Sequence, residues 1–369
     1  MPYPQLNRSK LIMKPLAQRQ NRKSIERNFV SINEMPPEFN ASDNAIISEC
    51  AERIITARKK SSPVILAFGA HTIKNGLAPI LIKLIETGYL THLATNGAGI
   101  IHDWEFAFQG ESSEDVKENM SKGEFGNWEE TGFFINLALN VGSYEGKGYG
   151  ESIGAFIYNE SLNIPSKEEL AEEVEKYLRK EPARASAAAE LLGVIQQFNL
   201  KPGQMQIAHR WKKFSIQAQA YQLGIPFTGH AMIGQDIIYN HPMNNGSLLG
   251  KAALRDFLSF AESVNHIENG VYLSVGSAVM SPMIFEKSMS MAQNLALQRG
   301  NQIKHHYILV VDLAKSNWDW DKGEPPEDNP AYYQRFNKTF SRMGGRLQTL
   351  SADNRAFLLA LYCKLQGKT

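Results

Sequence analysis

Three short stretches of this chain combine glycine, histidine and amide side chains directly after apolar runs. They cover residues 69–76 (GAHTIKNG), 96–105 (NGAGIIHDWE) and 229–241 (GHAMIGQDIIYNH). Small residues let backbone N–H groups approach a ligand, and imidazole groups can take up or release a proton near neutral pH. These stretches are therefore the first candidates for a binding or catalytic site.

In the first stretch, we predict that His71, Asn75 and Gly76 contribute to a cofactor site. The helix expected to follow would present its N-terminus, which favours an anion such as a phosphate. Neither this stretch nor the second matches a P-loop or the dinucleotide pattern G-x-G-x-x-G. Tight strand-to-helix turns explain the same glycines equally well, and both interpretations stay open.

The second stretch joins a glycine turn to side chains that could act as an acid, a base or metal ligands. On a helix, His102 and Glu105 share a face because they are three positions apart, while Asp103 points elsewhere. Acids in the first turn of a helix also complement its dipole, an alternative that applies to Asp103 and Glu105. We predict that His102 and Asp103 are catalytic. The cofactor-binding candidates of this stretch are Asn96, Gly97 and Gly99.

The third stretch is dense in polar residues directly after a predicted buried strand, and buried polar groups need partners. His230, Asp236 and His241 could orient a substrate or hold a divalent metal. Their spacing matches no standard zinc pattern, so the main prediction contains catalytic residues here and no metal site. His102 or His230 would be the general base, because imidazole titrates near neutral pH.

A fourth glycine corner covers residues 275–282 (VGSAVMSP). We predict that Gly276 and Ser277 contact a cofactor there. The alternative is that Ser277 merely caps the helix that starts at this corner, a role for which serine is well suited.

The pattern of apolar residues indicates how these stretches could be brought together. Residues 63–68 are a continuous apolar run, which suits a strand buried on both faces, and segments with helical periodicity alternate with further runs of this kind. This alternation is typical of an α/β fold with a doubly wound, mostly parallel sheet, in which ligands bind beyond the carboxyl ends of the strands. The predicted strands are residues 63–68, 89–95, 153–158, 225–233, 271–275, 306–313 and 347–350, and the main predicted helices are 42–58, 251–265, 282–298 and 354–365.

No Pro- or Ser-rich linker divides the chain. Five glycines between positions 142 and 154 predict a mobile loop leading into the strand at 153–158. A capping box at Ser166 and Glu169, followed by an alanine-rich segment, predicts a helical insertion near residues 160–200. Residues 1–40 begin with seven basic residues and one acid by Asn28, which predicts an exposed basic arm. We therefore expect a basic arm over residues 1–40 and a single α/β domain over residues 41–369.

Composition excludes several classes of protein. The 369 residues are 43% hydrophobic and carry 39 Lys and Arg against 38 Asp and Glu, so no net charge attracts nucleic acid or an anionic membrane. Two cysteines are too few for a disulfide framework or a zinc finger, and no apolar run is long enough to span a bilayer. We expect a cytoplasmic protein with a small-molecule substrate, without a nucleic-acid or membrane partner.

From residue 62 to residue 365, the order of the motifs resembles the deoxyhypusine synthase family, in its divergent bacterial branch. The strand at 64–68 with residues 69–76 is similar to the first strand and nicotinamide-cofactor loop of that family. Residues 95–103 lie where the family has Thr-Thr-Ala-Gly-Gly and then acids. Tyr158-Asn159-Glu160 is similar to a family strand that ends in Asn-Glu, and residues 225–227 and 245–248 are similar to its Ile-Pro-Val strand and Asp-Gly-Ser-Leu turn.

The resemblance implies a deoxyhypusine-synthase-like fold that binds NAD, and a homo-oligomer, as a dimer or tetramer. Members of the family use NAD to oxidise spermidine, hold its aminobutyl group on a lysine and pass it to a lysine of a translation factor. This chain has Met280 where the glycine-rich corner of the family carries a lysine, and no Trp-Gly-Lys occurs near residues 318–336. A thioether cannot form an imine, so the chemistry of the family is not carried over.

We therefore expect an enzyme that binds NAD or a related nucleotide and acts on a substrate other than spermidine and a translation factor. Two alternatives remain open. One is a metal-dependent hydrolase or lyase that uses His230, Asp236 and His241. The other is a non-catalytic nucleotide-binding oligomer that keeps the pocket and lacks the chemistry.

Overall fold

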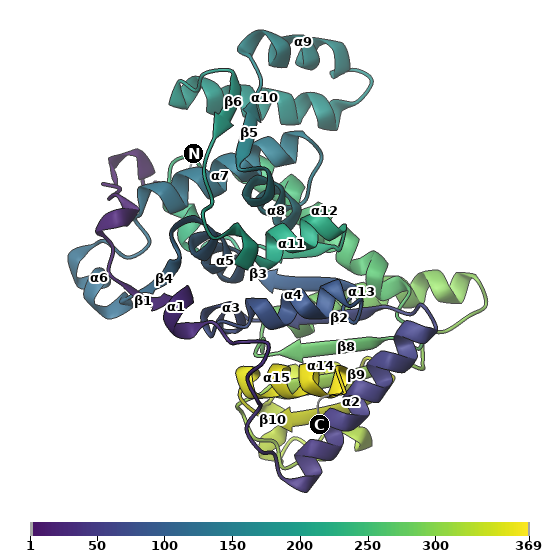
Figure 1. Ribbon diagram of the computed structural model, residues 1–369. Coiled ribbons are helices and arrows are strands. Elements are labelled where there is room, and N and C mark those ends of the chain that lie inside the picture. The colour runs from purple at the N-terminus through teal and green to yellow at the C-terminus, as the bar shows by residue number, and fades with distance from the viewer. Residues whose placement is uncertain (1–2, 368–369) are drawn as a thin grey trace. The chain divides into compact units, whose positions relative to one another are not determined.

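The computed structural model describes residues 3–367 and divides the chain into two compact units (Figure 1). The first unit contains residues 1–27, 100–221 and 231–256, and the second contains residues 28–99, 222–230 and 257–369. A compact unit need not fold independently. The predicted division into an arm over residues 1–40 and one domain over residues 41–369 therefore stays a prediction.

The second unit is built on a six-stranded sheet in which every neighbouring pair of strands is parallel. The strands lie in the order β10-β9-β8-β2-β3-β7. Figure 1 labels β10, β9, β8, β2 and β3 of this sheet. This is the doubly wound order, in which β2, the strand of this sheet that comes first along the chain, lies at the centre, and it confirms the predicted fold class. The strands are β2 (Val64–Phe68), β3 (His92–Asn96), β7 (Phe227–His230), β8 (Val271–Val275), β9 (Tyr307–Asp312) and β10 (Arg346–Ser351).

All residues of β2 and β8 are buried, because helices cover both faces of this sheet. On one face, Ile65 and Ala67 pack with Phe260, Tyr272 and Phe285 in an apolar cluster. The helices that belong wholly to this unit are α2 (Ala41–Lys59), α3 (Ala70–Lys74), α4 (Ala78–Glu86), α13 (Met280–Gln298), α14 (Arg335–Ser341) and α15 (Asn354–Leu365). Among residues 3–367, no helix has both the length and the apolarity that crossing a bilayer requires.

The first unit is mostly helical, with two small antiparallel pairs of strands, β1 with β4 and β5 with β6. Its strands are β1 (Asn21–Ser24), β4 (Glu111–Glu114), β5 (Ser161–Ile164) and β6 (Gly203–Gln206). The helices that lie in it, wholly or in part, are α1 (Ile25–Asn28), α5 (Gly97–Gln109), α6 (Val116–Lys122), α7 (Glu129–Tyr144), α8 (Tyr149–Asn159), α9 (Lys167–Tyr177), α10 (Pro182–Phe198), α11 (Ile216–Leu223) and α12 (Gly246–Asn265). The helical insertion predicted near residues 160–200 corresponds to α9, which opens with the predicted capping box, and α10.

The prediction of a mobile loop at 142–154 and a strand at 153–158 is wrong, because α7 and α8 occupy this region. A Cβ atom on Gly142 would lie 2.1 Å from Ser152 Oγ, and one on Gly154 would lie 2.6 Å from the carbonyl oxygen of Gln217. The glycines therefore allow neighbouring helices to pack closely. Because glycine has a low helix propensity, the glycines of this region predict a loop although two helices form here.

The start of the chain is more ordered than the predicted exposed arm. Residues 21–24 form β1, and Arg19 is only 6% exposed, with both terminal nitrogens 2.7 Å from the carboxylate of Glu105. Arg8 donates to the backbone carbonyls of Tyr239 and Asn244 at 2.8 and 3.1 Å. The sequence predicts a solvated basic surface here because the partners of Arg19 and Arg8 lie about ninety and more than two hundred positions away.

Candidate functional site

The carboxyl edge of the six-stranded sheet contains one position where the strand order reverses. The chain builds β2, β3 and β7 in one direction and then β8, β9 and β10 in the other, so β2 and β8 are adjacent at the reversal. Sheets of this type bind ligands in the crevice beyond such a pair of strands. Here β2 leads into Gly69 and β8 into Gly276, and the N–H of Gly69 donates to the carbonyl of Val275 at 3.1 Å. The two glycine corners predicted from the sequence therefore meet.

The two glycines have different roles. A Cβ atom on Gly69 would lie 2.1 Å from the carbonyl oxygen of Gly276, so a side chain at position 69 is excluded by the backbone of the neighbouring corner. Gly276 is exposed, has a φ of +56°, and no atom lies within 4 Å of the position its Cβ would take. The space in which a ligand could approach the backbone thus lies over Gly276.

Beyond Gly276, the chain enters α13, a helix of nineteen residues. Ser277 is buried and its Oγ accepts from the N–H of Ser281 at 3.2 Å, so Ser277 does cap the first turn. Ala278 and Val279 are exposed. Unpaired N–H groups at a helix N-terminus attract anions. Met280 is only 4% exposed, so its side chain points into the core.

The first predicted stretch contributes one exposed side chain to this edge of the sheet. His71 lies in α3 directly beyond β2 and is exposed. Asn75 donates to Asn354 Oδ1 at 2.9 Å, which ties the end of α3 to α15. Gly76 has a φ of +80°, and a Cβ there would lie 2.1 Å from the carbonyl oxygen of Asn28. Asn75 and Gly76 therefore hold this turn in place, and His71 is the residue of the three that a ligand can reach.

The second stretch begins where β3 passes into α5 with no connecting residue. Asn96 Oδ1 accepts from the N–H of Gly99 at 3.0 Å and so caps the first turn of α5. A Cβ on Gly99 would lie 2.2 Å from Thr95 Oγ1, so glycine is needed for the helix to pack on the strand it follows. Gly97 is buried, whereas Asn96 is half-buried at the edge of the sheet.

His230 ends β7 and belongs to a buried chain of hydrogen bonds that the sequence did not reveal. Its Nε2 lies 3.0 Å from Thr228 Oγ1, and the same oxygen lies 3.0 Å from Nε2 of His92. Nδ1 of His92 is 2.8 Å from Ser263 Oγ on α12. The signal that could have identified this network is the pair of polar residues two positions apart in β7, Thr228 and His230, together with a histidine at the start of the apolar strand β3.

Burial decides the charge of these histidines. It lowers the pKa of His230 to about 3. Burial, and then the nearby His230, lower the pKa of His92 to about 3 as well. The expectation that His230 titrates near neutral pH is therefore wrong, because both imidazoles are neutral there.

In the first unit, His102 is linked to Glu105 through a hydroxyl group. His102 Nδ1 lies 2.7 Å from Ser112 Oγ, which donates to Glu105 Oε2 at 2.5 Å. Burial alone would raise the pKa of Glu105, but the charge and hydrogen bonds of Arg19 outweigh burial and leave this pKa lowered. The shared helix face predicted for His102 and Glu105 exists, and it forms part of a buried ion-pair network.

Asp103 has a structural role. Its carboxylate is 1% exposed and accepts from Ser215 Oγ at 2.5 Å and from the backbone N–H groups of Ile216 and Gln217 at 3.0 and 3.2 Å. It therefore caps α11 from a distant part of the chain. Burial raises the pKa of Asp103 in spite of these hydrogen bonds.

His241 also has a packing role. Its Nδ1 accepts from the N–H of Met243 at 3.0 Å, so Nε2 carries the hydrogen and faces Glu129 Oε2 at 3.4 Å. The ring stacks on Phe198. Burial lowers the pKa of His241 although Glu129 opposes this change. Asp236 lies directly before a short 3-10 helix, residues 237–239, and is half-buried.

Within residues 3–367, no group of three or more His, Cys, Asp or Glu side chains is arranged to hold a metal ion. His230, Asp236 and His241 therefore form no such group. This finding counts against the metal-dependent hydrolase or lyase.

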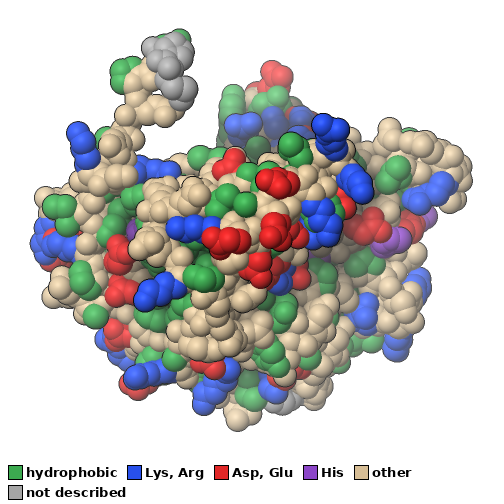
Figure 2. Space-filling view, turned by 90° about the horizontal axis from the view of Figure 1, so that it is seen from above, with side chains coloured by type: hydrophobic (Ala, Val, Ile, Leu, Met, Phe, Trp, Pro, Cys, Tyr) green, Lys and Arg blue, Asp and Glu red, His purple; other side chains and the backbone are tan. Residues whose placement is uncertain are grey.

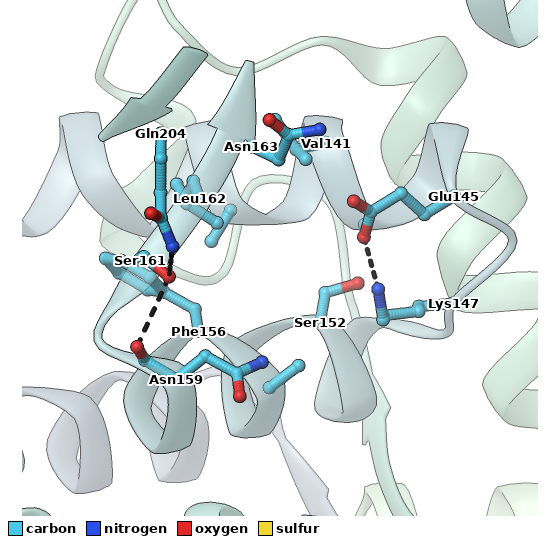
Figure 3. A pocket seen from close by; sticks show the side chains of 13 residues that line it. Val141, Glu145, Lys147, Ser152, Phe156, Asn159, Ser161, Leu162, Asn163 and Gln204 are labelled. Carbon is cyan, nitrogen blue, oxygen red and sulfur yellow. Dashed lines mark hydrogen bonds and ion pairs between the residues drawn. The ribbon is translucent and has the colours of Figure 1, made fainter. Parts of the chain in front are cut away.

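The first unit contains a cavity of about 370 Å³ between α7, α8, β5 and β6 (Figure 3). In Figure 3 the ion pair of Glu145 and Lys147 lies on one side, and Gln204 with Ser161 on the other. Amides and hydroxyls suit a small polar ligand. No sequence pattern singles out this cavity, because one wall of it is the glycine-containing helical region for which the sequence predicts a loop.

The molecular face in Figure 2 carries basic and acidic side chains interspersed with one another. This mixture agrees with the balanced charge of the sequence, 39 Lys and Arg against 38 Asp and Glu. The absence of a nucleic-acid partner stays a prediction.

No protein-family model matches the chain, and no curated protein is significantly similar to it. Several solved structures match at low identity. Unliganded AgrE is 14% identical, with a TM-score of 0.44 over 90% of this chain and 34% of its own. A Methanococcus maripaludis S2 protein assigned to the LOR/SDH group is 14% identical, with a TM-score of 0.44 over 90% of this chain and 74% of its own. An Entamoeba histolytica protein assigned as a deoxyhypusine synthase is 11% identical, with a TM-score of 0.36 over 86% of this chain and 88% of its own. This chain spans about a third of the length of AgrE.

Proposed function

We propose that this protein is an enzyme that binds NAD or a closely related dinucleotide at the β2–β8 reversal of its parallel sheet. The observation that carries the proposal is the strand order, with β2 and β8 adjacent at the reversal and an open glycine corner at Gly276. Doubly wound sheets of this order bind dinucleotides at this position. The resemblance of the motifs to deoxyhypusine synthases, which use NAD, agrees with it.

The residues at this edge suit the parts of a dinucleotide. Gly276 leaves open space over the backbone, and the N-terminus of α13 at Ala278 and Val279 would attract the pyrophosphate. Asn96, at the end of the adjacent strand β3, would bond a ribose hydroxyl. This ribose would belong to the nicotinamide half, so that the nicotinamide ring lies toward β7 and His230 and the adenosine half lies beyond β8. His71, exposed beyond β2, would contact the ligand from the side of α3.

The bound dinucleotide would supply a hydride acceptor, and His230 would supply the proton acceptor at the end of β7. We propose a substrate other than spermidine and a translation factor, because Met280 is a buried thioether in the place of a lysine. The substrate is then a small molecule with an oxidisable amine or alcohol.

Thermal unfolding of the full chain with NAD and with NADP tests the site. At 100 times Kd we expect the midpoint to rise by about 5 °C, since this concentration adds about 2.7 kcal/mol and large chains shift by about 2 °C per kcal/mol. Ala278→Glu should reduce the affinity at least roughly tenfold by placing a carboxylate beside the pyrophosphate. Ala45→Glu, at an exposed position of α2, is the matched control and should leave the affinity unchanged.

An unchanged midpoint at millimolar NAD and NADP would overturn the proposed site. Binding that Ala278→Glu and Ala45→Glu weaken equally would place the nucleotide elsewhere. Binding without reduction of the nucleotide, across a panel of small amines and alcohols, would support the non-catalytic nucleotide-binding oligomer.

A further inference from the structure

Four side chains of the second unit form a continuous hydrogen-bonded chain across one face of the sheet. Ala94 of β3 pairs with Thr228 of β7, and Asn96 pairs with His230. His92 and His230 therefore lie on the face that Thr228 shares, because side chains alternate along a strand. Helix α12 covers this face with Phe260, whose ring meets both imidazoles edge-on, and with Ser263, which is half-buried.

The single hydroxyl of Thr228 lies between two ring nitrogens, Nε2 of His92 and Nε2 of His230, both at 3.0 Å. A hydroxyl has one hydrogen to donate, and a neutral imidazole has one N–H and one acceptor nitrogen. The carbonyl of Leu93, at 3.5 Å, is too distant to compete for that hydrogen. One imidazole therefore donates to Thr228, and Thr228 donates to the other.

This arrangement couples the tautomers of the two histidines. In one state, His92 carries its hydrogen on Nε2 and His230 carries its hydrogen on Nδ1. In the other state, His230 carries it on Nε2 and His92 carries it on Nδ1, from which it donates to Ser263. Neither state places a charge in the core, which agrees with the neutral imidazoles that burial imposes.

We propose that Ser263, His92, Thr228 and His230 form a proton relay between the carboxyl end of β7 and the surface of α12. Its use rests on the proposed function. When a substrate alcohol or amine is oxidised, the hydride moves with its electron pair to the nicotinamide, and the O–H or N–H proton goes to Nδ1 of His230.

One concerted shift then balances the step. The Nε2 hydrogen of His230 moves to Thr228 Oγ1, and the hydroxyl hydrogen of Thr228 moves to Nε2 of His92. The Nδ1 hydrogen of His92 moves to Ser263 Oγ, whose own hydrogen leaves to water. The network ends in its other tautomeric state, and His230 acts through its neighbours instead of holding the charge itself.

Long-range ¹H–¹⁵N spectra of the imidazoles in the full chain, recorded without nucleotide, test the relay. We expect His92 and His230 to hold opposite tautomers and to remain neutral at pH 6. Ser263→Asp introduces an acceptor for His92 Nδ1–H, so it should shift His230 toward its Nε2–H form roughly tenfold, since hydrogen bonds to charged groups are about twice as strong. The same change in a Thr228→Val background should leave His230 unmoved, and Thr228→Ser should restore the coupling.

His241 is the internal control, because Met243 fixes its hydrogen on Nε2 and no variant touches it. A changed His241 signal would identify a misfolded variant, and the conservative Thr228→Ser protein then carries the test. Identical tautomers in His92 and His230, or a His230 that ignores Ser263→Asp, would overturn the relay.

Adding NAD to the same samples separates this proposal from the proposed function. Opposite, coupled tautomers without NAD binding would support the relay and overturn the nucleotide site. NAD binding with uncoupled tautomers would do the reverse.

Discussion

Each unit of this protein contains a histidine that is joined to a second ionisable side chain through one hydroxyl group. In the second unit Thr228 joins His230 to His92, and in the first unit Ser112 joins His102 to Glu105. The network of the second unit has no charge and no arginine, and burial keeps its imidazoles neutral. The network of the first unit contains a buried ion pair, in which Arg19 holds Glu105 ionised.

The comparison shows that the partners of a histidine, more than its place in the sequence, decide what it can do. A neutral network can exchange tautomers without moving net charge, which suits proton transfer. A network fixed by an ion pair is costly to rearrange, because any shift leaves a buried charge without its partner. This contrast supports the proposed proton transfer at His230 and indicates a structural role for Glu105 and Arg19.

The ion pair provides the largest expected effect. Arg19→Met leaves the buried carboxylate of Glu105 unpaired, which costs about 3–5 kcal/mol of the free energy of unfolding. Urea denaturation measures it. Arg22→Met, which removes an exposed arginine paired with Asp115, is the matched control and should change stability little. Equal losses in the two variants would contradict the distinction between the networks.

The hydroxyl group of Ser112 is expected to have the second largest effect on the free energy of unfolding. Ser112→Ala removes a hydrogen bond to an ionised carboxylate, and such bonds contribute about 1.5–3 kcal/mol. Ser121→Ala, at an exposed position of α6, should stay within about 0.5 kcal/mol of the unmodified protein in the same denaturation experiment. A loss below 1 kcal/mol for Ser112→Ala would show that the carboxylate finds another donor.

The pH dependence of stability distinguishes the networks directly. The pKa of His230 is lowered from 6.5 to about 3, so the unfolded chain binds the proton more readily, and stability falls as the pH drops from about 6.5 toward 3. Between pH 7 and pH 5 this amounts to about 2 kcal/mol for each such imidazole. His230→Gln should lose that share of the acid sensitivity, measured by denaturation at both pH values, whereas Thr228→Val should keep it.

The effect of Glu105 has the same sign as that of His230, but it falls in a lower pH range. Its pKa is lowered in the folded state, so its contribution is present above the unfolded value near 4.5 and is lost as the pH falls through the folded value. Acid sensitivity that begins near pH 6 therefore reports on the histidines, and sensitivity confined below about pH 4.5 reports on Glu105.

The smallest expected effect is that of the hydroxyl of Thr228 on stability. Thr228→Val keeps the shape of the side chain and removes neutral hydrogen bonds, each of which contributes about 1 kcal/mol. Thr228→Ser should retain most of the stability in the same measurement. A loss above about 3 kcal/mol for the valine variant would indicate a charged network, contrary to the comparison.

Several site predictions made from residue type require a different explanation in the folded protein. Asp103 has the right chemistry for catalysis, yet its carboxylate caps α11 more than one hundred positions away. Asn75 and Gly76 suit a cofactor loop, but their contacts with Asn354 and Asn28 hold the turn itself. Residue type reports what a side chain can do, and only its partners show whether that capacity is already used.

In the network of His92, Thr228 and His230, the opposite occurs, because the sequence analysis missed a residue that takes part in the proposed chemistry. His92 was not predicted, because a single histidine opening an apolar strand looks like an ordinary core residue. Its significance depends on β7 pairing with β3 across more than 130 residues of chain, in the register that places Ala94 opposite Thr228.

The sequence by itself determined the alternation of buried strands and helices, since apolar periodicity follows directly from which residues must leave water. It also determined that glycine corners follow β2 and β8, because tight exits from buried strands need small residues. Tertiary structure alone decided that those two corners meet, that Gly69 is closed off while Gly276 is open, and that His230 is neutral. The strand order, the contact between the two glycine corners and the burial of His230 depend on segments that are distant along the chain. A local sequence pattern therefore cannot predict them.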